Sequence, residues 1–235
     1  MRALLLAAGY GKRLRPVTDN IPKCLVPIHG KPLLAYWLEL LRRGGIERVV
    51  VNGHYLAQQV EHVVRAPKWA DLVIYVYEDR LLGTGGTVLR NRDHFNDGQP
   101  FLVAHADTLS RFDVHALAHR HKVRPAGVDI TMMTFDTDAP RTCGIVETNE
   151  DGVVTAFHEK VENPPSSLAN AAVYIFEPAV LYFLESLRQE YIDISTDVLP
   201  AYLGRIVTHH NSKYHRDIGT LQSLEKARKE FIPDQ

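Results

Sequence analysis

The chain has 235 residues, of which 45% are hydrophobic and 23% are charged, and its formal net charge is −1. This length fits one large domain, or one domain with a small appendage, that buries a sizeable core. The near-neutral charge offers no general attraction to nucleic acid or membranes, and no apolar run approaches the roughly 20 residues that span a bilayer. Since the N-terminus also lacks a signal-peptide pattern, we expect a cytoplasmic protein with small-molecule partners and no nucleic-acid or membrane partner.

Apolar, strand-like segments alternate with helical segments through the first half of the chain. Strands are predicted at 3–8, 48–52, 72–77, 101–104 and 129–134, and helices at 33–43, 56–65, 84–91 and 114–121. Repeated strand–helix–strand units predict an α/β fold, with a Rossmann-like, mainly parallel sheet flanked by helices. Ligands of such sheets bind at the carboxyl ends of the strands.

The pattern changes after Asp136. Segments 143–147 and 153–158 flank a turn that ends at Gly152, which predicts a hairpin. The remaining predictions are strands at 171–176 and 205–209 and helices at 178–188, 197–203 and 220–229. We expect a single domain, 1–235, with a small lobe inserted into the second half of the sheet.

The loop after the first strand holds two glycines and several cations. Gly9 and Gly11 let backbone N–H groups approach a ligand, while Arg13 and Lys23 supply positive charge. The spacing excludes two common phosphate loops. The dinucleotide fingerprint needs a glycine where Leu14 stands, and the Walker loop needs Ser or Thr where Arg13 stands. The loop is nevertheless typical of a triphosphate-binding site.

A longer signature contains this loop. It reads Gly-Tyr-Gly-Lys-Arg-Leu-Arg-Pro at 9–16, Pro-Lys-Cys-Leu at 22–25 and Gly-Lys-Pro at 30–32. It resembles the signature of sugar-nucleotide pyrophosphorylases, which join a sugar 1-phosphate to a nucleoside triphosphate, although Lys12 replaces the family's Thr and Cys24 its Pro. The resemblance implies the nucleotide-diphospho-sugar transferase fold, with 1–135 as the nucleotide-binding half and 136–235 as the sugar-phosphate-binding half.

Two aspartates match the family's Mg²⁺-binding motifs. Asp107 directly follows the predicted strand 101–104, and Asp217 lies in Tyr-His-Arg-Asp-Ile-Gly-Thr at 214–220. Carboxylate oxygens suit Mg²⁺, although each aspartate taken alone could instead cap the helix that follows it. The implied catalytic cations are Arg13, Lys23 and Lys160. The implied nucleotide-binding residues are Ala7, Ala8, Gly9, Gly11, Lys12, Asn52, Gly53, Glu78, Gly83 and Thr84.

The sugar side rests almost wholly on the resemblance. Phe-His-Glu-Lys at 157–160 is similar to the family's Phe-x-Glu-Lys-Pro, with Val161 in place of the Pro. In the relatives the Lys binds the phosphate of the sugar phosphate and the Glu binds sugar hydroxyls, which implies a sugar-binding role for Glu159. Gly144 and Asn170 match the family's remaining sugar-pocket positions. Without the resemblance, such a Glu-Lys pair is most often a solvated surface pair.

The implied reaction is attack by a sugar 1-phosphate on the α-phosphorus, with pyrophosphate leaving and charge balanced by cations and Mg²⁺. Leu-Gly-Thr-Gly-Gly at 82–86 looks most like guanylyltransferases of the mannose 1-phosphate type, which favours GTP with a mannose or heptose 1-phosphate. Uridylyl-, thymidylyl- and cytidylyltransferases of the same fold remain open, as does a non-catalytic subunit that senses sugar nucleotides. A nicotinamide-dependent dehydrogenase would need the missing third glycine. The oligomeric state also stays open, with a homo-oligomer one option.

Overall fold

A computed structural model of the chain describes residues 1–233 and contains two compact units. Unit 1 comprises Met1–Leu81, Ala104–Phe112 and the described residues from Lys213 onward, and unit 2 comprises Leu82–Val103 and Asp113–Ser212. Each unit is therefore assembled from segments far apart in the sequence. The functional division at 135/136 stays a prediction.

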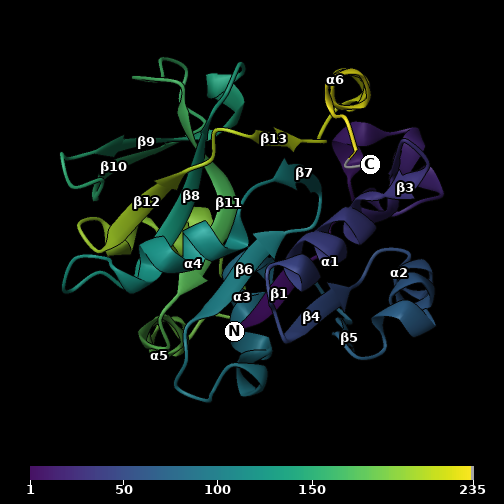
Figure 1. Cartoon of the computed structure of the whole chain (residues 1–235), viewed down its shortest axis with the longest axis horizontal. Helices are drawn as coiled ribbons and strands as arrows, with labels where there is room; N and C mark the ends of the chain where they lie inside the picture. Colours follow the sequence, from purple (N-terminus) through teal and green to yellow (C-terminus); the bar gives the residue numbers. More distant parts are fainter. Residues whose placement is uncertain (234–235) are drawn as a thin grey trace. The chain divides into compact units, whose positions relative to one another are not determined.

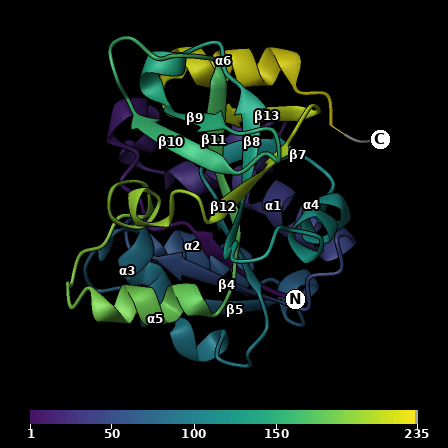
Figure 2. The same cartoon turned by 90° about the vertical axis from the view of Figure 1, so that its left-hand side faces the viewer.

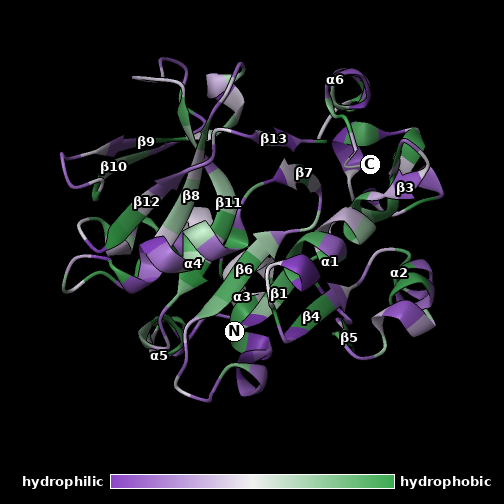
Figure 3. Cartoon of the chain, viewed as in Figure 1, coloured by the Kyte–Doolittle hydropathy of each residue, from purple (hydrophilic) through white to green (hydrophobic). Residues whose placement is uncertain are grey.

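Three parallel strands form the sheet of unit 1, in the order β1 (Arg2–Leu6), β4 (Arg48–Gly53) and β5 (Val73–Tyr77) (Figure 1). Most of β1 and β4 is buried, and Figure 3 shows hydrophobic residues along much of β4. Apolar runs of this kind are typical of strands covered on both faces. The helices of unit 1 are α1 (Leu33–Arg43), α2 (Ala57–Val64), which packs on β4 and β5, and α6 (Leu221–Glu230).

Two short antiparallel strand pairs complete unit 1. One joins β2 (Pro27–Ile28) to β3 (Lys31–Pro32), and the other joins β7 (Thr108–Arg111) to β13 (Tyr214–Asp217). The loops and α6 are held by one buried apolar cluster, formed by Leu14, Val26, Ile28, Leu33, Leu109, Ile218, Leu224, Ala227 and Phe231. This cluster joins the loop after β1, strand β7 and residues 218–231 in one core.

Five strands form the sheet of unit 2, in the order β10 (Val154–Glu159), β9 (Gly144–Thr148), β11 (Leu168–Phe176), β8 (Ile130–Asp136) and β12 (Ile206–His210) (Figure 2). Only β12 and β8 run parallel, and the other neighbours are antiparallel. The helices are α3 (Gly83–Arg90), α4 (Val114–Lys122), which packs on β8 and β12, and α5 (Ala179–Ser186). Strand β6 (Phe101–His105) carries the chain from unit 2 to unit 1.

The predicted α/β class is confirmed, with helices flanking a mixed sheet and a hairpin, β9–β10, in the second half. The predicted helix 33–43 is α1, residue for residue. The helix predicted at 197–203 is wrong: Ile194–Val198 forms a π-helical turn and Pro200–Tyr202 a 3-10 turn. Pro200 lacks the N–H that a continuous helix would use, which breaks the segment there. No helix within residues 1–233 is both long and apolar enough to cross a membrane.

Candidate functional site

Four charged side chains from distant parts of the sequence meet in unit 1, and we call them the ionic cluster: Arg13, Lys23, Asp107 and Asp217. Lys23 Nζ lies 2.8 Å from Asp107 Oδ2 and 2.7 Å from Asp217 Oδ1. Arg13 Nη2 lies 3.5 Å from the other carboxylate oxygen of Asp217, Oδ2. Since both aspartates contact one nitrogen, their carboxylates are close enough to share a single cation.

The β7–β13 pair brings the two aspartates together. Asp217, the last residue of β13, pairs with Thr108, the first residue of β7, so Asp107 stands directly before this pair. The Ile218 N–H donates to the backbone oxygen of Asp107 at 3.4 Å. Lys23 approaches from a third segment, where it opens the 3-10 turn Lys23–Leu25 after an extended Pro22.

Burial and charge set the protonation of the cluster. The Lys23 side chain is only 7% exposed, whereas the side chains of Asp107 and Asp217 are 35% and 47% exposed. Burial alone would lower the pKa of Lys23, but the two carboxylates outweigh it and raise that pKa above its usual value. Burial opposes ionisation of Asp107 too, yet the Lys23 charge lowers the pKa of Asp107. Both groups are therefore charged at neutral pH.

Two neighbours of the cluster, Cys24 and His215, are uncharged at physiological pH. Burial raises the pKa of the Cys24 thiol to about 12, so the thiol has little nucleophilic character. Burial lowers the pKa of His215 to about 3, and the electrostatic interaction with the nearby His105 acts in the same direction, so His215 is neutral at physiological pH. The cations in direct contact with the aspartates are Lys23 and Arg13.

The donor set of the cluster fits Mg²⁺. Asp107 and Asp217 offer carboxylate oxygens on their more exposed side, and Mg²⁺ is ordinarily held by one or two carboxylates with the remaining oxygens from substrate phosphates and water. Among residues 1–233, no group of three or more His, Cys, Asp or Glu side chains is arranged to hold a metal. The pair would therefore hold Mg²⁺ only with further oxygen ligands, as a triphosphate supplies.

Gly9 and Gly11, the two glycines of the loop after β1, differ in the space around them. Gly11 has a positive φ of 64°, and a Cβ atom there would lie 3.0 Å from Thr18 Cγ2 and 3.1 Å from Lys23 Cβ, so the fold itself requires glycine. A Cβ atom at Gly9 would meet nothing within 4 Å. Packing within the fold therefore does not require glycine at position 9. The space beside Gly9 is open, so a ligand could approach the backbone of the loop there.

Lys12, which replaces the family's Thr, lies against an aromatic side chain. Its Nζ is 5.2 Å from the centre of the Tyr10 ring, within the range of a cation–π contact. The Tyr10 hydroxyl is 3.1 Å from His54 Nε2, and the Tyr10 ring packs against Tyr55. Tyr55 in turn donates to the backbone oxygen of Thr18 at 2.8 Å, which ties the loop to the residues after β4.

Other predicted nucleotide-binding residues of unit 1 already have structural partners. Asn52 is buried, and its Oδ1 accepts the Ala7 N–H at 2.7 Å. A Cβ atom at Gly53 would lie 2.4 Å from Tyr75 Oη, so packing alone demands this glycine. Glu78 is buried, and its N–H donates to Gly53 O at 2.9 Å. Their roles in nucleotide binding, like that of Ala8, stay predictions.

The glycine-rich start of α3 packs against a loop of unit 2. A Cβ atom at Gly83 would lie 2.3 Å from Ile192 O, and the N–H groups of Gly85 and Gly86 donate to the same oxygen at 2.8 and 3.1 Å. The Thr84 hydroxyl accepts the Ile194 N–H at 2.7 Å. Two backbone N–H groups at this helix end are therefore bonded to Ile192, and the roles of Gly83 and Thr84 in nucleotide binding stay predictions.

The predicted sugar-binding residues lie in unit 2, on neighbouring strands. Gly144 pairs with Glu159 across the β9–β10 hairpin, and a Cβ atom at Gly144 would lie 2.8 Å from Glu159 Oε2 and 2.4 Å from the Phe157 ring. Lys160 Nζ lies 2.5 Å from Glu159 Oε1. Lys160 is 60% exposed and holds a left-handed backbone with φ of 50°, a conformation that costs free energy in a residue other than glycine.

Asn170 sits at an irregularity in β11. The register with β8 shifts between Asn170 and Tyr174, and Ala172 between them has a positive φ of 52°. The Asn170 side chain donates to Tyr174 Oη at 2.6 Å and accepts the Ala172 N–H at 2.9 Å. These bonds fix the amide of Asn170 in one orientation.

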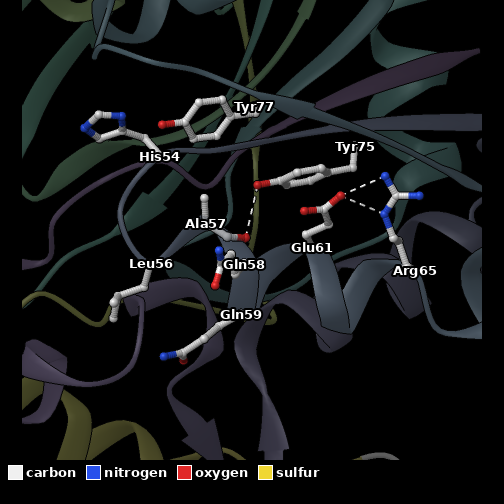
Figure 4. A pocket seen from close by; sticks show the side chains of 9 residues that line it. All are labelled: His54, Leu56, Ala57, Gln58, Gln59, Glu61, Arg65, Tyr75 and Tyr77. Atoms are coloured by element: carbon white, nitrogen blue, oxygen red, sulfur yellow. Dashed lines mark hydrogen bonds and ion pairs between the residues drawn. The ribbon is translucent and has the colours of Figure 1, made fainter.

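A separate pocket of about 650 Å³ opens beside α2 and β5. Figure 4 shows Glu61 beside Arg65, and Tyr75 with its hydroxyl directed at the backbone oxygen of Ala57, 3.1 Å away. The pocket shares no lining residue with the ionic cluster. Its full lining is His54, Leu56, Ala57, Gln58, Gln59, Glu61, Arg65, Tyr75 and Tyr77.

Gly219 is a residue that the sequence interpretation missed. A Cβ atom there would lie 2.5 Å from Asp217 Oδ2 and 3.0 Å from Arg13 Nη2. The missing side chain therefore makes room for two members of the ionic cluster. The only available signal was its place in Asp-Ile-Gly-Thr, two residues after Asp217.

Comparison with known proteins gives consistent matches. A family model described as nucleotidyl transferase matches residues 2–233. A UTP–glucose-1-phosphate uridylyltransferase of Synechocystis is 33% identical, and the match covers 85% of this chain and 54% of the relative. A mannose-1-phosphate guanylyltransferase of Mycobacterium tuberculosis is 31% identical, and the match covers 98% of this chain and 64% of the relative. The chain thus spans between about half and two thirds of the length of these relatives. The solved structure of HddC from Yersinia pseudotuberculosis complexed with GMP-PN has a TM-score of 0.80 and 26% identity, over 98% of this chain and 99% of that one.

Proposed function

The chain belongs to the nucleotidyl transferase family, and we propose that it makes a nucleoside diphosphate sugar and pyrophosphate from a nucleoside triphosphate and a sugar 1-phosphate. The observation that carries the proposal is the ionic cluster, in which Lys23 contacts both Asp107 and Asp217. A reaction between two polyanions needs cations beside fixed carboxylates that can hold a metal. A nicotinamide-dependent dehydrogenase has no use for such a cluster.

Each charged group of the ionic cluster has a role in the proposal. Asp107 and Asp217 hold Mg²⁺, which when bound neutralises charge on the triphosphate. Lys23 stabilises the negative charge at the α-phosphorus, and Arg13, whose side chain is 64% exposed, binds the leaving pyrophosphate. The backbone around Gly9, where space is open, receives the phosphates.

Unit 2 supplies the groups proposed to bind the sugar phosphate. Lys160 attracts the phosphate, because its side chain is mostly exposed and its ammonium group contacts the neighbouring Glu159. Glu159 and Asn170 bind sugar hydroxyls, with Gly144 leaving room for the Glu159 carboxylate. No covalent nucleophile is needed, because a phosphate monoester is already ionised near neutral pH.

We further propose GTP as the triphosphate and a mannose or heptose 1-phosphate as the acceptor. The guanylyltransferase relative and the GMP-PN complex of HddC support guanine. The uridylyltransferase relative supports the alternative of a uridylyltransferase. A cytoplasmic location belongs to the same proposal and rests on the sequence alone, whereas the oligomeric state stays open, with a homo-oligomer one option.

The deciding experiment is a pyrophosphate-release screen of the purified protein with Mg²⁺. GTP, UTP, dTTP and CTP are each combined with mannose, heptose and glucose 1-phosphates, and release that depends on both substrates is expected to be greatest with GTP. Asp107→Asn should abolish release while the melting temperature stays near that of the unaltered protein. Asp71→Asn, which changes an exposed carboxylate paired with Arg42, serves as the control and should keep full activity.

Two outcomes would overturn the proposal. One is full turnover by Asp107→Asn, which would remove the metal pair from the mechanism. The other is binding of a sugar nucleotide without pyrophosphate release under any combination, which would favour a non-catalytic sensing subunit.

A further inference from the structure

The residues proposed to bind the sugar lie in one row across three neighbouring strands of unit 2 (Figure 2). Glu159 of β10 pairs with Gly144 of β9, and Ala169 of β11 pairs with Ile145 of β9. Because β11 and β9 are antiparallel, the next residue of β11, Asn170, lies opposite Gly144. A Cβ atom at Gly144 would lie 2.8 Å from Glu159 Oε2. The carboxylate of Glu159 and the amide of Asn170 therefore flank a position that has no side chain.

Two hydrogen bonds hold the amide group of Asn170. Its Oδ1 accepts the Ala172 N–H at 2.9 Å, and its Nδ2 donates to Tyr174 Oη at 2.6 Å. The first bond also decides which end of the amide is the oxygen, because a backbone N–H needs an acceptor. A primary amide has two donor hydrogens and two acceptor positions. These bonds use one of each, so one N–H and one lone pair are left for a ligand.

An irregularity in β11 brings Tyr174 to Asn170. In the register of β11 with β8, Asn170 pairs with Thr134 and Tyr174 pairs with Met132, so four steps along β11 correspond to two along β8. Such a bulge places Asn170 and Tyr174 about 7 Å apart along the strand direction, rather than about 14 Å as in a regular strand. Ala172, within the bulge, has a left-handed φ of 52°. This conformation costs free energy, and such strain is found mainly at functional sites.

Tyr174 is a rigid and neutral partner. It is 1% exposed, and its ring stacks on Phe176 with the ring centres 5.4 Å apart. Burial raises the pKa of Tyr174 and outweighs the opposite effect of the hydrogen bond from Asn170. The phenol therefore keeps its proton at physiological pH, and its packed ring holds the hydroxyl oxygen in one place.

We infer that Tyr174 is a positioning residue of the sugar site: its hydroxyl group holds the amide of Asn170 so that the second N–H of this amide donates to a sugar hydroxyl beside Glu159. The inference rests on the proposed function, because it requires that Asn170 binds the sugar. The two flanking groups are complementary, since a carboxylate only accepts hydrogen bonds and Asn170 offers a donor. Adjacent hydroxyls of a sugar satisfy both, one as the donor and the other as the acceptor.

The test compares Tyr174→Phe with the unaltered protein in the pyrophosphate-release assay. The substrates are the pair that reacts fastest in the screen, which we expect to be GTP and mannose 1-phosphate. The variant keeps the ring and removes the hydroxyl, so the amide of Asn170 loses one of its two bonds. The KM for the sugar 1-phosphate should rise about tenfold, the effect of one lost hydrogen bond. The KM for the triphosphate should not change, and kcat should change little, because the contact acts in substrate binding.

A double-mutant cycle separates positioning from a general effect on the fold. Asn170→Ala should raise the same KM at least as much as Tyr174→Phe. The double variant should be no worse than Asn170→Ala alone, because Tyr174 acts through Asn170. Tyr36→Phe is the matched control: it removes a hydroxyl group that donates to Ile28 O at 3.0 Å in unit 1, and both KM values should stay unchanged. A melting curve of each variant verifies that it is folded at the assay temperature.

The inference is overturned if Tyr174→Phe leaves the KM for the sugar 1-phosphate unchanged or raises both KM values alike. It is also overturned if the effects of the two variants add, or if Asn170→Ala alone leaves that KM unchanged, a measurement that does not depend on the folding of Tyr174→Phe. In each of these cases, pyrophosphate release by the unaltered protein would still support the proposed function. If the unaltered protein releases no pyrophosphate with any substrate pair, the proposed function fails and this inference fails with it.

Discussion

Replacing Gly219 by alanine should damage the proposed reaction far more than the fold. The new Cβ atom would lie 2.5 Å from Asp217 Oδ2 and 3.0 Å from Arg13 Nη2, whereas ordinary contacts are 3.4 Å or longer. The carboxylate of Asp217 must therefore move by about 1 Å, and a misplacement of that size costs on the order of 100-fold in rate. This corresponds to about 2.7 kcal/mol in the activation free energy.

The cost to folding should be small, because both crowded atoms are the ends of side chains that are about half exposed or more. Losing or lengthening exposed ion pairs changes the free energy of unfolding by about 1 kcal/mol or less. The assay is the rate of pyrophosphate release at saturating Mg²⁺ together with a melting curve of each variant.

Thr220→Ser is the matched control for Gly219→Ala. Thr220 is the next residue in the chain, and its hydroxyl caps α6 by accepting the Ser223 N–H at 3.1 Å, a bond that serine can keep. This variant should retain the rate of the unaltered protein. If Gly219→Ala also keeps the full rate, or loses it only by unfolding, the argument that Gly219 makes room for the ionic cluster is wrong.

Three further outcomes are expected. Arg13→Ala should slow pyrophosphate release by about 100-fold or more, the usual cost of losing one contact to developing charge, with little change in the melting temperature; an unchanged rate would remove Arg13 from the mechanism. Gly144→Ala should destabilise the protein by about 1–3 kcal/mol in thermal or urea unfolding, since its Cβ atom would lie 2.4 Å from the Phe157 ring, and unaltered stability would contradict the packing. Burial lowers the pKa of His121 to about 4. His121 is therefore protonated near pH 6.5 in the unfolded chain but only near pH 4 in the folded chain. Stability should therefore fall as the pH drops from about 6.5 towards 4, by up to about 1.4 kcal/mol per pH unit, and urea titrations of His121→Gln should show a shallower slope.

Local patterns were sufficient for the elements that carry their own signals. Helix α1 was predictable to the residue because Pro32 precedes it, Gly44 follows it, and seven of its eleven residues are buried along an apolar face. The strands β1 and β4 were predictable as short apolar runs, with ends shifted by one or two residues. In each case the determining interactions lie within about ten residues of sequence.

The pairing of β7 with β13 was not predictable from local patterns. Thr108–Arg111 and Tyr214–Asp217 are each four residues long and mostly polar, and neither shows the alternation of a half-buried strand. Their pairing joins residues more than 100 positions apart. The sequence could name Asp107 and Asp217 through a resemblance, but only the register of this pair explains why they contact one ammonium group.

The glycine-rich segment at 83–86 shows the opposite difficulty, a local signal with two physical explanations. A ligand that approaches the backbone closely and a neighbouring loop that does so both demand glycine. In unit 2 the loop is present: Ile192 O accepts two N–H groups and leaves no room for a Cβ atom at Gly83. A single sequence cannot separate these explanations, because the partner that needs the glycine lies more than 100 residues away.

The precision of the ionic cluster depends on apolar residues rather than on the charges themselves. Exposed or half-exposed ion pairs hold their partners weakly, yet each charged segment of the cluster carries an apolar residue that is anchored in one buried core. Leu14 follows Arg13, Val26 lies three residues after Lys23, Leu109 lies two residues after Asp107, and Ile218 follows Asp217. Each of these four apolar side chains is fully buried, and removing one would cost several kcal/mol. The hydrophobic effect thus fixes the backbone from which the charged side chains extend, and electrostatic attraction then needs only to select their rotamers.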